Sequence, residues 1–182
     1  QANLITHRAA RKLPDQYNLG RIAMSYFANA VGAAVTDVEA LPWIPFLPYS
    51  EELKLKIIRL NPVNGEWVSL LRVPAGMGMP KHYHSGTVHV YTLSGSWGYK
   101  EHDWTAGPGS FVFETAASAH TPVAQPGEDV VTLNIVMGDW NIVDENDAVL
   151  AVENWKWMLK RYDDYCSANG IAPVDITSFA GN

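Results

Sequence analysis

Two histidines separated by a single residue, His82 and His84, and a later third histidine, His120, constrain this sequence more than any other feature. Side chains two residues apart on an extended strand point to the same face of a sheet. If the stretch around Tyr83 is a strand, His82 and His84 therefore share a face. A third imidazole arriving from another strand would supply three nitrogen ligands for a first-row transition metal.

The sequence around these histidines is built from short apolar stretches with turn signals between them, the pattern of an all-β sandwich or barrel. Strands are expected at 53–60, 66–73, 88–94, 96–101, 110–114 and 130–136. In the first of them Leu53, Leu55, Ile57 and Arg59 are expected on one face and Leu60 on the other. Glycine and proline separate the strands.

The pattern changes after Asp144, where apolar residues recur at helical spacing. Those residues are Trp155, Leu159, Tyr162 and Cys166. Asn154 is a candidate N-cap, and Asn169-Gly170 is a stop signal. The segment is expected to form a helix of about four turns that packs on the outside of the barrel.

The 182 residues fit one structural domain with a sizeable core. We expect an N-terminal extension at 1–50, a barrel at 51–145, and a helix and tail at 146–182. Alanine-rich Met24–Val35 is a candidate helix. The proline-rich stretch from Pro42 to Tyr49 has the composition of an extended arm, which would cover either its own barrel or a neighbouring subunit.

Composition excludes several classes of protein. Apolar residues make up 47% and charged residues 18%, which is ordinary for a globular chain. The net charge of −6 gives no electrostatic reason to expect nucleic acid or an anionic membrane as a partner. The single cysteine, Cys166, excludes an internal disulfide framework. The sequence shows no apolar run of about 18 residues and no signal-peptide pattern, so a cytoplasmic protein is expected.

Glycines frame the histidines at regular spacing. One motif runs from Gly76 through the histidine pair to Gly95, and a second runs from Gly109 to His120. This layout resembles the two sequence motifs of the cupin superfamily, although Thr115 and Ala117 replace a proline and a glycine of the second motif. The resemblance implies a single-domain β-barrel, or jelly roll, with a metal at its centre.

The glutamate of the first cupin motif is absent, because Val88 stands in its place. Three neutral imidazoles would leave the charge of a divalent metal uncompensated unless another acid reaches it. In the expected strand 96–101, Trp97 and Tyr99 should face the interior, and Glu101 has the same parity. Glu101 is therefore the candidate fourth ligand, with a catalytic role, whereas His89 has the opposite parity to Val88 and is expected outside.

Further runs carry a narrower resemblance. They are 81–92, 99–104, 114–116, 120–122 and 151–156. Together they resemble the 2,4′-dihydroxyacetophenone dioxygenases, bacterial single-domain cupins that use non-haem iron. The resemblance implies Fe(II) held by His82, His84, His120 and Glu101. It also implies a small aromatic hydroxyketone and O₂ as substrates, with 4-hydroxybenzoate and formate as products.

A ring substrate needs an apolar, aromatic-lined slot with a polar end, and Trp97 and Tyr99 are the candidates for its wall. Cupin habit favours a homodimer or homotetramer. The residues alone leave the metal open among iron, manganese, nickel, copper and zinc. Three other functions also stay open: a zinc-binding sensor of the anti-sigma type, a β-diketone-cleaving dioxygenase, and a sugar-binding or isomerase cupin.

Overall fold

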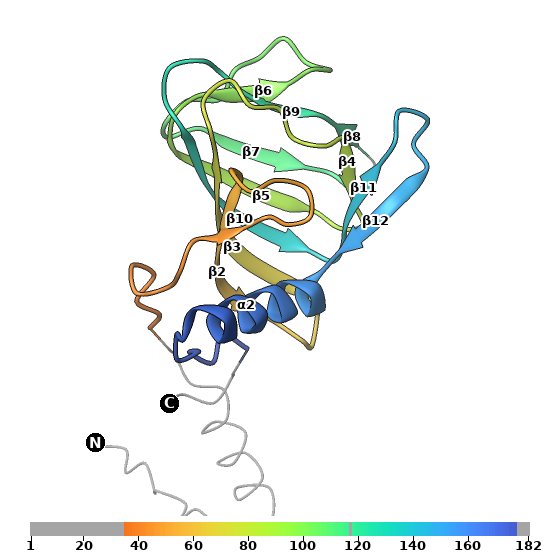
Figure 1. Cartoon of the computed structure of the whole chain (residues 1–182). Coiled ribbons are helices and arrows are strands. Elements are labelled where there is room, and N and C mark those ends of the chain that lie inside the picture. Colours follow the sequence, from red (N-terminus) through yellow and green to blue (C-terminus); the bar gives the residue numbers. More distant parts are fainter. Residues whose placement is uncertain (1–34, 117, 178–182) are drawn as a thin grey trace, which may run out of the picture. The chain divides into compact units, whose positions relative to one another are not determined.

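The fold consists of antiparallel strands in three sheets (Figure 1). In this computed structural model, which describes residues 35–116 and 118–177, the largest sheet has six strands. In order across the sheet they are β1 (Ile44–Pro45), β2 (Lys54–Leu60), β3 (Glu66–Val73), β10 (Val130–Met137), β5 (Val88–Ser94) and β7 (Phe111–Glu114).

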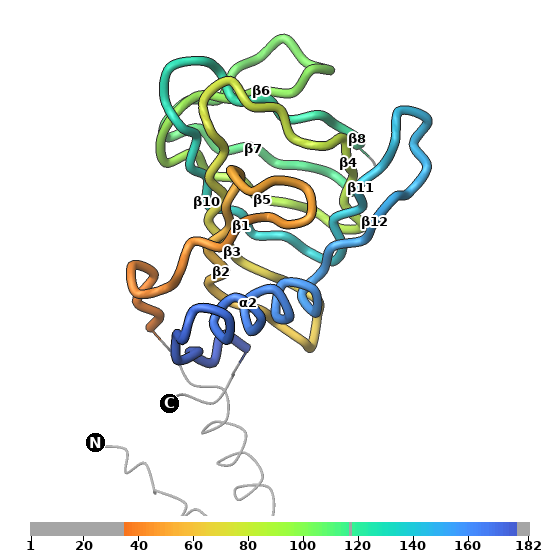
Figure 2. The backbone as a smooth tube through the Cα atoms, viewed as in Figure 1, coloured from red at the N-terminus to blue at the C-terminus, as the bar shows by residue number. Residues whose placement is uncertain are grey.

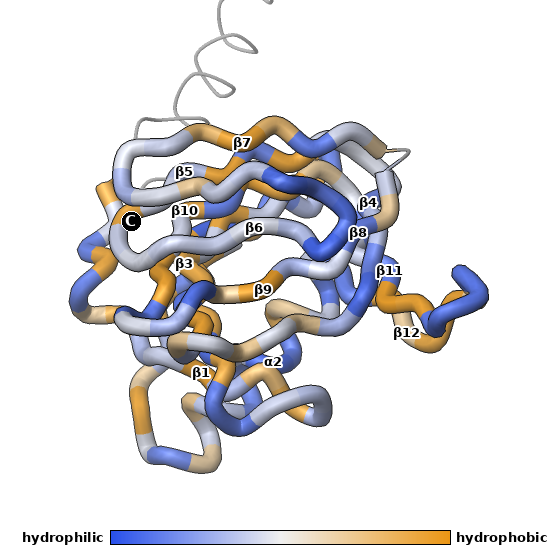
Figure 3. The backbone as a smooth tube through the Cα atoms, turned by 90° about the horizontal axis from the view of Figure 1, so that it is seen from above, coloured by the Kyte–Doolittle hydropathy of each residue, from blue (hydrophilic) through white to orange (hydrophobic). Residues whose placement is uncertain are grey.

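Two smaller sheets complete the barrel. The four-stranded sheet has the order β12 (Val149–Glu153), β11 (Trp140–Val143), β4 (His82–His84) and β8 (Ala119–His120). Strands β6 (Trp97–Tyr99) and β9 (Pro122–Ala124) form the third sheet. Seen from above, the β11–β12 hairpin projects to one side of the remaining strands (Figure 3). The predicted all-β jelly roll is confirmed.

The core lies between the sheets because the strands alternate buried and half-buried residues. Strand β10 shows this best, since every second residue from Val130 to Val136 is buried. Predicted strands 66–73 and 88–94 coincide with β3 and β5. The prediction for β2 fails at its end, because a bulge between Ile57 and Arg59 shifts the register. Leu60 is consequently buried where Arg59 was expected.

Helix α2 (Trp155–Asn169) packs against β2, β1 and β12 on the outside of the sheets (Figure 1). It begins where predicted, because the Asn154 side chain accepts hydrogen bonds from the backbone N–H groups of the first turn. It ends at Gly170, whose left-handed conformation lets its N–H reach the last carbonyls. Its buried residues are Met158, Tyr162 and Cys166.

The proline-rich arm covers its own barrel. Strand β1 pairs with the N-terminal end of β2, and the two lie side by side in Figure 2. Phe46 is fully buried, and its ring stacks on Trp140 with 4.9 Å between centroids. The helix predicted at Met24–Val35 lies outside the described residues except for Val35. No helix in the described part of the chain is long and apolar enough to cross a membrane.

Candidate metal centre

The four-stranded sheet brings the three histidines together. His82 and His84 are the two ends of β4 and point to the same inner face, both almost fully buried. Strand β8 pairs antiparallel with β4, so that His120 lies directly opposite His82. The pairing of neighbouring strands thus produces the cluster that the spacing predicted.

The imidazole nitrogens converge on one point. Potential ligand atoms of His82, His84 and His120 all lie within 4.8 Å of one another, and the Nε2 atoms of His82 and His120 are 3.1 Å apart. The Nδ1 atom of His82 lies 2.8 Å from the carbonyl oxygen of Pro80. That hydrogen bond places the ring proton on Nδ1 and leaves the Nε2 lone pair facing the cluster.

A carboxylate that the sequence reasoning missed completes the cluster. Oε2 of Glu114, at the end of β7, lies 3.2 Å from Nε2 of His84 and 3.4 Å from Nε2 of His120. Its register partner on β5 is Val88. Val88 occupies the position of the absent cupin glutamate. In this chain a carboxylate stands instead on β7, directly opposite that position on β5.

Glu101 lies apart from this cluster, which corrects the parity argument. Strand β6 ends at Tyr99, and Lys100 and Glu101 form a turn in which the alternation no longer holds. Glu101 is exposed, and its carboxylate accepts hydrogen bonds from the backbone N–H and the hydroxyl of Thr121, at 2.8 and 2.7 Å. It therefore braces the segment that follows His120.

The other two histidines of the described residues, His89 and His102, lie outside the cluster. His89 packs against Phe111 and Phe113 with 5.7 and 5.4 Å between ring centroids, on the outer face, as its parity predicted. His102 is exposed and contacts the rings of Tyr99 and Trp104.

Charge states in the cluster suit a metal. Burial, and then the neighbouring His84 and His120, hold the pKa of His82 well below its ordinary value of 6.5, so its ring is neutral. Burial alone would raise the pKa of Glu114, but the imidazoles of His120 and His84, 3.4 and 3.2 Å from its Oε2, outweigh it and lower the pKa. Metal binding requires these two forms, a neutral imidazole and an ionised carboxylate.

Comparison with known proteins identifies the family. Residues 31–139 match the profile of the ChrR cupin-like domain. The chain is a cupin. It is similar to an RmlC-like cupin protein from Ralstonia eutropha JMP134, at 48% identity over 82% of this chain and 96% of that one, with a TM-score of 0.78.

Two more distant structures share the fold of this cupin. An acetylacetone dioxygenase from Acinetobacter johnsonii is 16% identical over 90% of this chain and 99% of that one, with a TM-score of 0.63. A putative acetylacetone dioxygenase from Methylibium petroleiphilum PM1 is 18% identical over 72% and 95%, with a TM-score of 0.66. No curated protein matches the sequence.

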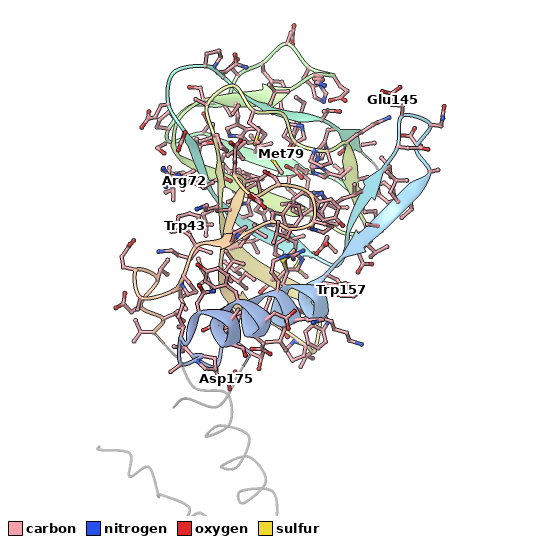
Figure 4. The ribbon with its side chains drawn as sticks, viewed as in Figure 1. Trp43, Arg72, Met79, Glu145, Trp157 and Asp175 are labelled. Atoms are coloured by element: carbon pink, nitrogen blue, oxygen red, sulfur yellow. The ribbon has the colours of Figure 1, made fainter. Side chains whose placement is uncertain are left out.

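The metal face of this cupin opens on a cavity of ≈ 60 Å³ inside the barrel. Several water molecules could occupy it, because one enclosed water needs about 10–15 Å³ of such space. Trp97 and Tyr99 line it, as their alternation predicted, and Met79, labelled in Figure 4, lies on its wall. Most of the lining is apolar. Contact between Trp97 or Tyr99 and a substrate stays a prediction.

Buried polar atoms without a hydrogen-bond partner gather at this cavity. Within the described chain such side-chain atoms are Ser69 Oγ, His84 Nδ1, Glu114 Oε2 and Trp140 Nε1. All four residues line the cavity. An unpartnered buried polar atom costs about 1–3 kcal/mol, so their concentration in one place indicates a ligand site. Three converging imidazoles beside the free Oε2 of Glu114 are a donor set that fits a divalent transition metal.

Proposed function

We propose that this cupin is a non-haem iron(II) dioxygenase that cleaves the bond between the ketone carbon and the hydroxymethyl carbon of an aromatic α-hydroxyketone. The observation that carries the proposal is the convergence of His82, His84, His120 and Glu114 on an apolar, aromatic-lined cavity. For 2,4′-dihydroxyacetophenone the reaction takes up one O₂ and yields 4-hydroxybenzoate and formate, which together contain both oxygen atoms.

Four side chains would hold the metal, three histidines from the four-stranded sheet and Glu114 from the six-stranded sheet. His82, His84 and Glu114 also line the cavity, so a ligand in the cavity would lie beside the metal. Iron(II) bound there would supply a centre that chelates two oxygens and reacts with O₂. An α-hydroxyketone presents two oxygens on adjacent carbons, a geometry suited to such chelation.

The protein's own groups prepare the carboxylate. Tyr99 donates its hydroxyl hydrogen bond to Oε1 of Glu114, which leaves Oε2 facing the histidines. Oε2 is therefore placed to bind the metal together with the imidazoles. Burial, and then the charge of Glu114, raise the pKa of Tyr99 well above its ordinary value, so the phenol stays a hydrogen-bond donor.

Aromatic walls suit the ring of the substrate. The faces of Trp97 and Tyr99 stand at 70° with 5.3 Å between their centroids, and both line the cavity. Trp140 contributes a third aromatic wall, packed against His82 with 4.9 Å between centroids. These side chains present apolar surface to the cavity, which favours an apolar ring there.

A non-catalytic zinc-binding role is the competing candidate, because the matching family is described by the ChrR cupin. A purely structural metal is expected to have a closed coordination shell. The cavity beside the cluster and its unpartnered atoms favour the enzyme instead.

Oxygen uptake tests the proposal directly. The protein would be loaded anaerobically with iron(II), its metal content measured, and 2,4′-dihydroxyacetophenone added with O₂. We expect one O₂ consumed per substrate, with 4-hydroxybenzoate and formate in equal amounts. A His84→Ala variant should bind less iron and show no uptake, whereas His89→Ala should match the wild type because His89 lies outside.

Three results would redirect the proposal. Uptake with acetylacetone but not with the hydroxyketone would indicate a β-diketone dioxygenase. Bound iron without uptake on either compound would send the search to other hydroxyketones. Tight zinc with no affinity for iron would favour the sensor.

A further inference from the structure

Polar side chains follow the inner face of the six-stranded sheet, where a barrel core is normally apolar. They are Ser69 on β3, Thr92 on β5, and Thr132 and Asn134 on β10. All four are buried, and three of them, Ser69, Thr132 and Asn134, line the cavity. Buried hydroxyl and amide groups are unfavourable unless something hydrogen-bonds to them. Any residue of this stripe that lacks a hydrogen-bond partner therefore indicates a position for a ligand.

The strand register places the stripe relative to the metal face. Trp67, Val136, Val88 and Glu114 lie across from one another on four neighbouring strands and form one layer. The next layer lies two residues along each strand, toward the Val73 end of β3, and contains Ser69 and Asn134, which are direct register partners. Two residues of a strand span about 7 Å. Ser69 and Asn134 thus lie one layer beyond the carboxylate of the metal face.

Ser69 is the member of the stripe that lacks a partner. Its side chain is 1% exposed, and its Oγ forms no hydrogen bond. Asn134, beside it, is fixed, because its Nδ2 donates to the carbonyl oxygen and the hydroxyl of Thr132 at 3.2 and 3.0 Å. Ser69 and Asn134 therefore form a preorganised hydrogen-bonding position, because the Asn134 amide is already fixed and the Ser69 hydroxyl has no bond to break when a ligand binds.

Charge limits what can bind there. The ionisable groups on the cavity wall are His82, His84, Glu114 and Tyr99, and the first three belong to the metal face while Tyr99 is hydrogen-bonded to Glu114. The wall around Ser69 and Asn134 carries neutral groups only. A carboxylate, phosphate or ammonium would be desolvated there without a counter-charge. A neutral hydroxyl would not be penalised in this way.

We infer that Ser69, with Asn134 beside it, binds a neutral hydroxyl group at the end of the substrate farthest from the metal. The inference rests on the proposed function and narrows its substrate class to aromatic molecules that carry polar groups at both ends. Two oxygens on adjacent carbons bind at the metal face, an aromatic ring lies between Trp97 and Trp140, and a phenolic hydroxyl reaches Ser69. Ser69 would be a specificity-determining residue with no part in the chemistry.

Binding of unreactive ligands tests the subsite separately from catalysis. 4′-Hydroxyacetophenone and 4′-methylacetophenone have nearly the same shape and lack the α-hydroxyl that the reaction needs. Their affinity for the iron(II)-loaded wild type, kept anaerobic, would be followed by the fluorescence of the cavity tryptophans. An apolar cavity without a polar subsite would bind the methyl compound more tightly. We expect the hydroxyl compound to bind about 5-fold or more tightly, the value of one hydrogen bond.

Variants assign the preference to a residue. In Ser69→Ala the preference should fall to about 1 or reverse, whereas Ser94→Ala should keep it, because Ser94 Oγ donates to the Asp129 backbone outside the cavity wall. A wild type that prefers the methyl compound overturns the inference without needing any variant. A preference that Ser69→Ala leaves intact overturns it as well. If the hydroxyl preference and its loss in Ser69→Ala are observed but no oxygen uptake is found, the subsite stands and only the proposed reaction fails.

Discussion

Tyr99 donates a hydrogen bond from its hydroxyl to Oε1 of Glu114 in the interior of the barrel. The ring of the same tyrosine stacks on His120 with 4.2 Å between centroids and an angle of 15°. One side chain on the two-stranded sheet thus fixes a carboxylate from one sheet and an imidazole from another. Tyr99 is a positioning residue for the candidate metal face.

Replacing Tyr99 by phenylalanine keeps the ring stack and removes the hydroxyl. Glu114 would then retain a buried carboxylate oxygen without its donor, which costs about 1–3 kcal/mol in the free energy of unfolding. Urea unfolding of the metal-free protein would measure the loss. Tyr91→Phe is the matched control, since Tyr91 is 43% exposed on the outer face of β5. Equal stability of the two variants would show that the Tyr99 hydroxyl contributes nothing there.

Two glutamates compete for the role of fourth ligand, and paired variants separate them. Glu114 faces His84 and His120, whereas Glu101 binds Thr121. Glu114→Gln should weaken iron(II) affinity by about 10- to 100-fold or more, since changing a group that only supports a metal ligand already has an effect of this size. Glu101→Gln should leave affinity within about 2-fold of the wild type, because it removes only a brace.

Metal titration of both variants, with bound iron measured by elemental analysis, checks this pair. Loss of iron from Glu101→Gln alone would favour Glu101 as the fourth ligand, as strand parity predicted. Loss from both would mean that the Thr121 brace, which follows His120 directly, is needed to keep that histidine in place.

The histidine cluster could be predicted from sequence because it depends only on strand periodicity. His82 and His84 must share a face of any strand that contains them. The fold motif then fixes which later strand carries His120. A glycine of the motif could also be predicted, because only glycine fits its position. Gly95 has a positive φ of 68°, and a Cβ there would lie 2.7 Å from the carbonyl oxygen of Asp129.

Glu114 could not be predicted, because β7 reverses the usual pattern of burial. Phe111 and Phe113 are 62% and 54% exposed, whereas Glu114 is buried. Periodicity reasoning assigns the bulky apolar residues of a strand to the interior, and here that rule points the wrong way. The outer phenylalanines pack against His89, so the apolar side of this strand faces outward. The pairing of Glu114 with Val88 on the neighbouring strand determines that Glu114 faces inward, and the sequence around Glu114 contains no sign of this pairing.

Helix α2 and strand β12 are joined by a largely buried ion pair, Arg161–Glu153, whose removal should be costly. Arg161 donates two hydrogen bonds to Glu153, at 3.0 and 3.1 Å, and a third to the carbonyl oxygen of Leu47. Its guanidinium also lies 4.8 Å from the centroid of Phe46. Arg161→Gln should lower the free energy of unfolding by about 3 kcal/mol, since the buried Glu153 loses its counter-charge.

A neighbouring pair on the same helix provides the control. Lys160 contacts Asp164 at 2.6 Å, but both side chains are more than half exposed. Lys160→Gln should therefore change stability by no more than about 0.5 kcal/mol. Urea unfolding of both variants would compare them, and similar losses would argue against a special role for Arg161. Trp157, labelled in Figure 4, lies on the same helix and gives a fluorescence signal for its unfolding.

The pH dependence of stability should reveal His82 in the metal-free protein. Its folded-state pKa lies well below the ordinary 6.5, so near and below that pH the unfolded chain binds a proton that the folded chain does not. Stability must then fall as pH drops from about 7 towards 5, by up to about 1.4 kcal/mol per pH unit for this group. Glu114 acts lower: its folded pKa is depressed, so its contribution is complete above 4.5 and is lost only as pH falls below that value.

Urea unfolding in EDTA between pH 7 and 5 therefore measures the contribution of His82 to the free energy of unfolding separately from that of Glu114. His82→Asn should flatten the slope relative to the wild type, whereas His89→Asn should preserve it, because His89 lies on the outer face. A wild-type stability that stays constant over this range would contradict a buried neutral His82. Adding a divalent metal should raise stability throughout this pH range, because folded His82 is already neutral and Glu114 already ionised, the forms that bind a metal.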